Sequence, residues 1–172
     1  MTDKIEPRQR RPVRIKARDF AQPGVYLVTV YTYHKDCLFG QVVDGIMKFN
    51  RLGLIVRKTW LDMPHNYPHV ALDAFCVMPN LIQGIVVLVD DFPDLVRSSL
   101  NENGTQTLLR QGLSAIVKAF KSNSTQRVKA ARSGSDLSVW QRSYRSEVVH
   151  DGEELERLRE VIENKPKNWS EC

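Results

Sequence analysis

The segment from Leu81 to Val89 is almost uninterrupted in its apolar character, and it constrains the fold more than any other part of the chain. A strand with one solvated face alternates apolar and polar residues, whereas a strand covered on both faces is apolar throughout. Only Gln83 and Gly84 interrupt this run. We therefore predict a central β-strand with other elements packed on both of its faces.

Strand patterns and helix patterns alternate along the rest of the chain. Runs rich in β-branched and aromatic residues predict further strands; these cover residues 25–33, a hairpin over 38–49 that turns at Asp44-Gly45, and residues 70–77. Apolar residues at helical spacing predict three helices; these cover residues 52–63, ending before Pro64, then 109–120 and 153–163. The pattern favours an α+β fold in which helices pack on one sheet.

Basic residues are concentrated in two parts of the chain, although the net charge is only +5. An N-terminal arm, residues 1–18, carries Arg8, Arg10, Arg11, Arg14 and Lys16. A second cluster comprises Lys118, Lys121, Arg127, Lys129 and Arg132. Residues 121–138, rich in Ser, Lys and Arg, predict a basic loop, with its mobility left open. Clusters of this kind suit the phosphate backbone of a nucleic acid, although they are also found as solvated surfaces without a partner.

Composition excludes several classes of protein. A hydrophobic fraction of 42% with 26% charged residues is ordinary for a globular chain. No apolar run reaches the length of a membrane span, and the N-terminus is too polar for a secretory signal. The cysteines at 37, 76 and 172 predict neither a disulfide framework nor a zinc motif, so we expect reduced thiols. We expect a cytoplasmic, nucleoid-associated protein with no membrane contact and no cofactor.

Five segments, in order and at compatible spacing, resemble the REP-associated tyrosine transposases, a branch of the single-tyrosine HUH transposase family. They are Gln22–Thr29, Cys37–Gly40, Asp73–Asn80, Ile116–Ser122 and Val139–Tyr144. The resemblance covers roughly residues 12–169 and implies a ferredoxin-like antiparallel sheet with packed helices. It also implies a single transposase-like domain, residues 19–169.

The residues that carry the chemistry of that family are replaced here. In the family, a strand beginning Met-Pro-Asn continues with two histidines that hold a divalent cation, and a tyrosine on the last helix attacks a DNA phosphate. Such a metal neutralises developing charge while the nucleophile forms a covalent intermediate. In this chain the histidine positions are Leu81 and Gln83, and the tyrosine position is Val161. A fourth position, often an amide near the metal, is Lys165.

Neither leucine nor valine can serve these roles, so the resemblance implies a catalytically inactive descendant without a bound metal. Gln83 could either face a ligand or be satisfied by a neighbouring side chain. Tyr144 is a weak alternative nucleophile, and His65 and His69, separated by Pro68, are expected in a loop. His34 and His150 are expected at the surface.

The family recognises DNA hairpins with a short single-stranded flank, which requires basic grooves and stacking platforms. The candidate DNA-binding residues are therefore the two basic clusters together with Trp140, Gln141, Arg142 and Tyr144, although core packing remains an equal alternative for the aromatics. We expect a protein that binds DNA hairpins or single-stranded DNA, as a monomer or a homodimer. One alternative is a protein-interaction or scaffold module that has lost DNA binding. The other is an active, metal-dependent DNA-nicking transposase that uses residues outside the family pattern.

Overall fold

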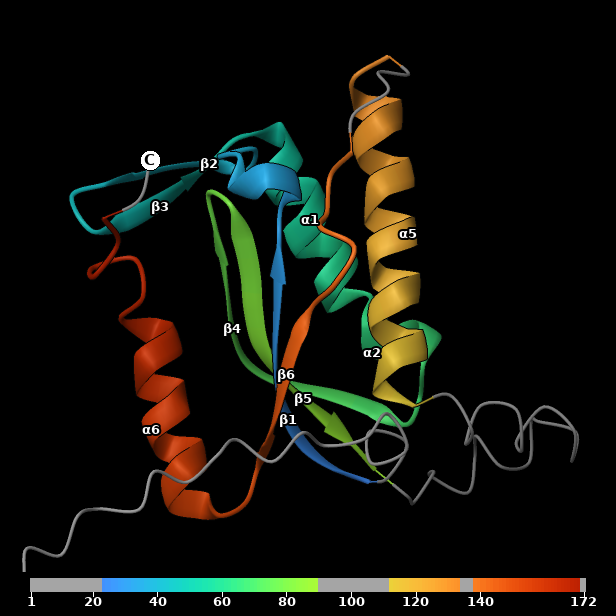
Figure 1. The fold of residues 1–172 in the computed structure, drawn as a ribbon, viewed down its shortest axis with the longest axis vertical. Coiled ribbons are helices and arrows are strands. Elements are labelled where there is room, and N and C mark those ends of the chain that lie inside the picture. The colour runs from blue at the N-terminus through green and yellow to red at the C-terminus, as the bar shows by residue number, and fades with distance from the viewer. Residues whose placement is uncertain (1–22, 90–111, 134–137, 171–172) are drawn as a thin grey trace, which may run out of the picture.

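The computed structural model describes residues 23–89, 112–133 and 138–170. A four-stranded antiparallel sheet forms its centre, in the order β4-β5-β1-β6 (Figure 1). Its strands are β1 (Gly24–Tyr31), β4 (Val70–Met78), β5 (Leu81–Leu88) and β6 (Arg145–Val149). A separate hairpin of β2 (Gly40–Val43) and β3 (Ile46–Phe49) follows a short 3-10 turn, η2 (Tyr33–Lys35). The hairpin turns at Asp44 and Gly45, both with positive φ, as predicted.

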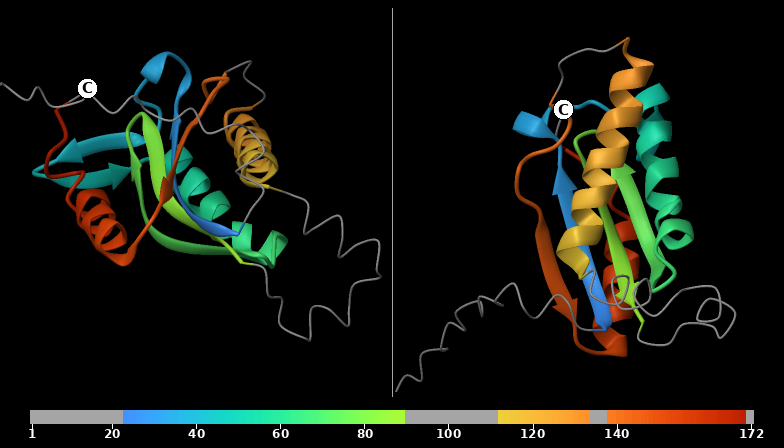
Figure 2. Two further views of the ribbon diagram at one scale, coloured as in Figure 1. Left: turned by 60° about the horizontal axis from the view of Figure 1, so that its bottom comes forward. Right: turned by 90° about the vertical axis from the view of Figure 1, so that its right-hand side faces the viewer.

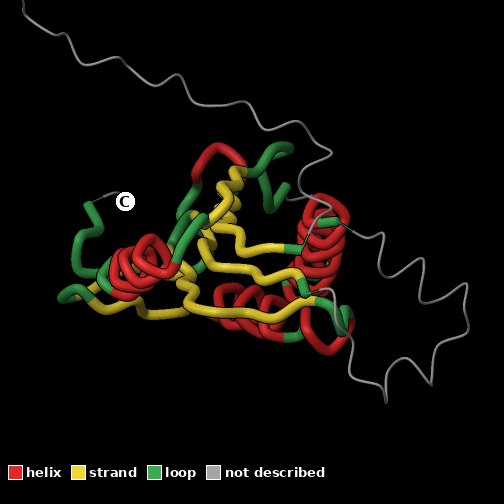
Figure 3. The backbone as a smooth tube through the Cα atoms, turned by 90° about the horizontal axis from the view of Figure 1, so that it is seen from below, coloured by secondary structure: helices red, strands yellow, loops and turns green. Residues whose placement is uncertain are grey.

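The helices lie on both faces of the sheet (Figures 2 and 3). They are α1 (Arg51–Leu61), the short α2 (Met63–Asn66), α5 (Leu113–Ala131) and α6 (Gly152–Glu163). One face is covered by α1 and α5, and the other by α6 (Figure 2). With β1, α1, β4, β5, α5 and β6 the chain follows a β-α-β-β-α-β path, and its strand order is ferredoxin-like. The predicted fold class is confirmed.

Two hydrophobic cores sandwich β5, as its apolar sequence predicted. Ile82 and Val86 face the core beneath α1 and α5, while Ile85 faces the smaller core beneath α6. Gly84 is required by this packing, because a Cβ atom there would lie 2.8 Å from Cζ2 of Trp60 and 2.6 Å from Cβ of Phe75. The absence of a side chain at Gly84 therefore allows the Trp60 indole to pack directly against the sheet.

Helix α5 extends much further than the sequence indicated, and the loop predicted over residues 121–138 is wrong for residues 121–131, which are helical. The helix continues to Ala131, and residues 134–137 lie outside the described part of the chain. The apolar stripe passes from Phe120 through Ser124 to Val128, all three buried. Ser124 is accommodated because its hydroxyl donates to the carbonyl of Phe120 at 2.7 Å. Because this buried position is occupied by a serine, the apolar residues of the sequence did not show that the helix continues past Phe120.

Two smaller expectations also need correction. Pro64 does not simply end a helix: α1 stops at Leu61, and the proline sits in the first turn of α2, where its missing N–H costs nothing. His65 is consequently helical rather than part of a loop.

Cys37 is disulfide-bonded, so the expectation of reduced thiols throughout is wrong, whereas Cys76 is a free thiol.

Candidate nucleic-acid interface

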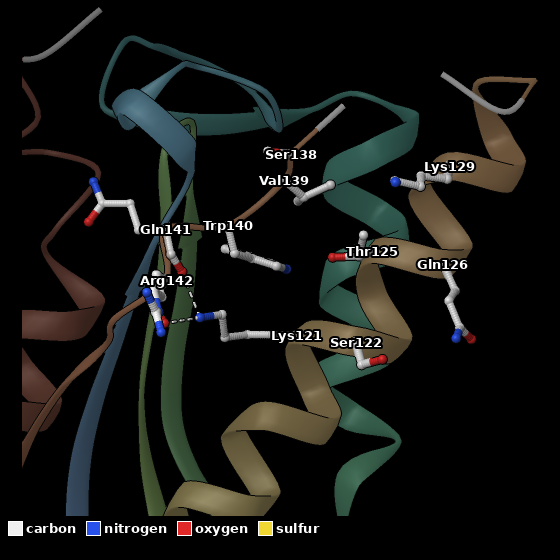
Figure 4. A pocket seen from close by; sticks show the side chains of 10 residues that line it. All are labelled: Lys121, Ser122, Thr125, Gln126, Lys129, Ser138, Val139, Trp140, Gln141 and Arg142. Carbon is white, nitrogen blue, oxygen red and sulfur yellow. Dashed lines mark hydrogen bonds between the residues drawn. The ribbon is translucent and has the colours of Figure 1, made fainter. Parts of the chain in front are cut away.

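A groove of about 520 Å³ lies between α5 and residues 138–142, on the face of the sheet opposite α6 (Figure 4). It brings together residues of the predicted DNA-binding set that are distant in sequence, namely Lys121, Lys129, Trp140, Gln141 and Arg142. The rest of the lining consists of the apolar Val139 and four uncharged polar residues, namely Ser122, Thr125, Gln126 and Ser138. Among the described residues that line it, none is acidic.

Lys121, on α5, holds residues 141 and 142 on the opposite side of this groove through hydrogen bonds. Its Nζ donates to the carbonyls of Gln141 and Arg142, at 2.6 and 2.9 Å (Figure 4). Partial burial lowers the pKa of Lys121 below its ordinary value, because desolvation disfavours the charged form. The side chain of Gln141 points away from α5 in Figure 4, so its backbone rather than its amide meets the lysine. Lys121 shapes the groove rather than offering a solvated cation.

Arg127 is also engaged within the protein. Its Nη1 donates to Asp62 Oδ2 at 2.7 Å and to Thr59 Oγ1 at 3.1 Å, which ties α5 to α1. The ion pair neutralises the charge that a phosphate would meet. In contrast, Lys118 and Arg132 are exposed. They share a helix face with groove residues, because positions 118, 122, 125, 129 and 132 follow one another at spacings of four and three.

The two aromatic candidates belong to the protein interior more than to a stacking surface. Trp140 is only 7% exposed, and its ring packs beside Phe39 and Phe120. The indole N–H donates to Ser124 Oγ at 2.9 Å. Tyr144 is half-buried, and its hydroxyl lies 2.8 Å from Ser114 Oγ. Trp140 is therefore a core residue, which was the alternative left open for both aromatics, and Tyr144 packs against the same core.

On the opposite face, three of the four replaced positions meet. Leu81 begins β5, Val161 lies on the last turn of α6, and Lys165 follows that helix; all three line one cavity of about 270 Å³. Leu81 is 3% exposed, whereas Val161 is 47% exposed, so the valine side chain is open to solvent at the cavity wall. Tyr31, the register partner of Leu81 on β1, also lines it, together with Trp169. Sequence reasoning missed both aromatics.

Gln83 is satisfied in part by the protein itself. Its Nε2 donates to Thr29 Oγ1 at 2.9 Å, across the β1–β5 pairing. No described residue donates a hydrogen bond to its buried Oε1. Its neighbour Cys76, opposite it on β4, is an unsuitable nucleophile because burial raises the pKa of the thiol to about 11, despite the opposing charge of Lys165.

The described residues contain no group of three or more His, Cys, Asp or Glu side chains placed to hold a metal ion. His34 and His150 are exposed, as expected, while His69 is 4% exposed and belongs to the interior. The arm carrying Arg8, Arg10, Arg11, Arg14 and Lys16 lies outside the described residues. No helix within them is long and apolar enough to cross a membrane.

Helix α6 is attached to the sheet by charge as well as by its apolar face. Arg159 donates through Nε and Nη2 to the two carboxylate oxygens of Asp73, at 2.8 and 2.5 Å. This bidentate pair lowers the pKa of Asp73 below its ordinary value, and the Ala74 N–H contributes in the same direction. The rest of α6 is strongly acidic, with glutamates at 153, 154, 156, 160 and 163. The two helical faces of the molecule therefore differ in charge: α5 carries lysine and arginine but no acid.

No protein-family model matches the chain. A solved structure of a REP-associated tyrosine transposase bound to a REP hairpin has a similar fold, with a TM-score of 0.57 over 85% of this chain and 68% of that chain, at 14% identity. A candidate transposase from Deinococcus radiodurans, at 16% identity, gives a TM-score of 0.45 over 88% of this chain and 97% of its own. An uncharacterized protein of Haemophilus influenzae (strain Rd) is 31% identical over 166 residues, which is 94% of this chain and 91% of that protein. The chain therefore belongs to the same family as this Haemophilus influenzae protein and has a transposase-like fold.

Proposed function

We propose that this protein binds DNA hairpins, or single-stranded DNA next to them, and does not cut them. The groove beside α5 carries the proposal. Its wall carries the exposed Arg142, and no acidic side chain occurs among the described residues that line it. Lys118 and Arg132 extend the same basic face along and beyond the helix. A polyanion gains from such a surface by releasing counterions.

The distribution of charge favours this face over the opposite one. The glutamates of α6 would repel a DNA backbone, whereas α5 has no acid to oppose it. The likeness in fold to a transposase bound to a REP hairpin supports the choice of ligand. A hairpin formed by a palindromic repeat is thus the ligand to test first.

The proposed loss of catalysis rests on which residues occupy the cavity between β5 and α6. Leu81 and Val161 carry no metal ligand and no nucleophilic atom. Lys165 would repel a cation placed between them. One observation favours a competing function: Tyr31 is among the residues that line the same cavity, so a DNA-cleaving reaction that uses this tyrosine is the alternative.

A fluorescence anisotropy titration with a labelled DNA hairpin at low and moderate salt tests the proposal. We expect tight binding at low salt and a steep loss of affinity as salt rises. Heparin competition and an unrelated hairpin of equal length report how much of the binding depends on charge and how much on the hairpin. If no hairpin binds even at low salt, DNA binding is excluded and the scaffold reading replaces it.

A further inference from the structure

A further cavity, of about 290 Å³, lies beside β4, the strand at one edge of the sheet. Residues 75–77 of this strand line it. Glu163 reaches it from the end of α6 and Arg57 from α1, and these two helices cover opposite faces of the sheet (Figure 2). It shares no lining residue with the cavity of Leu81 and Val161, so it is separate from the replaced positions.

Most of the lining of this edge cavity is apolar or aromatic. Val77 and Ile162 are 3% and 2% exposed, whereas Phe49, on the β2–β3 hairpin, is 37% exposed. Cys76 adds a thiol, which packs as a small apolar group. An apolar side chain that enters the cavity gains free energy in proportion to the area that it removes from water. The remaining apolar members of the lining are Met47, Phe75 and Pro166.

Two charged side chains of opposite sign complete the lining. Arg57 and Glu163 are both exposed, and neither side chain forms an ion pair or a hydrogen bond with another described residue. Glu163 would repel an apolar anion bound to Arg57, and Arg57 would repel an apolar cation bound to Glu163. A ligand that carries both charges avoids both repulsions. Its carboxylate can accept two parallel hydrogen bonds from the guanidinium, and its ammonium can donate to the glutamate.

We infer that the edge cavity binds a free apolar α-amino acid of the size of leucine, methionine or phenylalanine. The carboxylate of the ligand lies on Arg57, its ammonium on Glu163, and its side chain against Phe75 and Ile162. The volume of about 290 Å³ is just below the roughly 300–1,000 Å³ of sites for drug-sized molecules, which suits a ligand of this size. This inference concerns a small-molecule site and does not depend on DNA binding.

Isothermal titration calorimetry tests the inference. L-Leucine, L-methionine and L-phenylalanine are titrated first, and the tightest of the three is compared with its analogues that lack either the ammonium or the carboxylate. For leucine these analogues are 4-methylpentanoate and 3-methylbutylamine. The amino acid should bind about 10-fold more tightly than either analogue, the lower end of what a hydrogen bond to a charged group contributes. L-Serine, which has both charges but no apolar side chain, should not bind.

Two variants each remove the partner of one charge. Arg57→Gln should weaken binding of the amino acid about 10-fold and leave binding of the amine analogue no weaker. Glu163→Gln should weaken binding of the amino acid by a similar factor and leave binding of the acid analogue no weaker. The matched controls are Arg51→Gln on α1 and Glu160→Gln on α6, because both residues are exposed and neither lines the cavity. Both controls should bind the amino acid as the wild-type protein does.

Three outcomes would overturn the inference. The first is that none of the three amino acids binds. The second is that either analogue binds the wild-type protein as tightly as the amino acid, since the cavity would then recognise only one of the two charges. The third is that the control variants weaken binding as much as Arg57→Gln and Glu163→Gln do. A failure to bind DNA leaves the inference standing, because no DNA is present in these titrations.

Discussion

Replacing Lys118 should flatten the salt dependence of DNA binding, whereas replacing Arg127 should not. Both residues are basic and both lie on α5, but the structure gives them different surroundings. Lys118 is exposed on the face shared with the groove. Arg127 is paired with Asp62 at 2.7 Å, so its charge is already neutralised within the protein.

The magnitude follows from counterion release. Each phosphate contact with duplex DNA adds about 0.9 to the slope of log affinity against log salt concentration. Lys118→Gln should therefore lower the slope by about 0.9, which corresponds to roughly a 3- to 4-fold smaller loss of affinity for a fourfold rise in salt. Arg127→Gln should leave the slope unchanged and reduce the free energy of unfolding by at most about 1 kcal/mol, since the Arg127–Asp62 pair is partly exposed.

Anisotropy titrations over a series of salt concentrations measure both slopes, and urea unfolding measures stability. Arg142→Gln serves as a second test of the groove, because Arg142 is exposed and lines it. If Arg127→Gln flattens the slope as much as Lys118→Gln does, the Arg127–Asp62 pair does not keep Arg127 from DNA. Equal slopes for all the variants and the wild type would show that DNA does not contact this face.

Three further predictions concern the framework. Asp73→Asn should lower the free energy of unfolding by about 1 kcal/mol at neutral pH. Because Arg159 lowers the pKa of Asp73 below its ordinary 3.8, this difference should be complete above that pH and be lost as the pH falls through the lowered pKa of the folded protein; a difference that persists in strong acid would contradict the assignment. Because burial raises the pKa of the Cys76 thiol to about 11, this thiol should react slowly with iodoacetamide at neutral pH until the protein unfolds. Mass spectrometry follows the reaction, and rapid modification of the native protein would show that the thiol is accessible. Trp140→Phe removes the hydrogen bond to Ser124 and should lower the free energy of unfolding by about 1 kcal/mol or more, while DNA affinity stays the same. Weaker DNA binding by a variant that remains folded would indicate that the Trp140 ring contacts DNA.

The fold could be predicted from sequence where a pattern reports a local physical requirement. The apolar run from Leu81 indicated a strand buried on both faces. The dipeptide Asp44-Gly45 indicated the turn of the separate β2–β3 hairpin, since few other residues accept that backbone conformation. The length of α5 could not be predicted, because Ser124 looks like a loop residue until Phe120 and Trp140 provide its hydrogen-bond partners.

The candidate site was predictable only in part, for a different reason. The replaced positions Leu81, Val161 and Lys165 were identified by their place in a family pattern, and the structure brings them to one cavity. Tyr31 and Trp169 belong to no local motif, and they join that cavity only through strand register and the fold of the chain after α6. Likewise, the sequence does not distinguish the basic residues of α5 from one another. Arg127 is paired with Asp62, a residue distant in sequence, and only the structure shows this pair.

We propose that this protein, with its transposase-like fold, binds DNA without cutting it. A labelled hairpin with a single-stranded flank, incubated with the protein and Mg²⁺ or Mn²⁺ and divided between a native and a denaturing gel, tests this most directly. We predict a shifted complex on the native gel, and intact DNA with no covalent adduct on the denaturing gel. A cleaved strand or a protein–DNA adduct that disappears in the Tyr31→Phe variant would show instead that the protein cuts DNA, and would identify Tyr31 as a nucleophile.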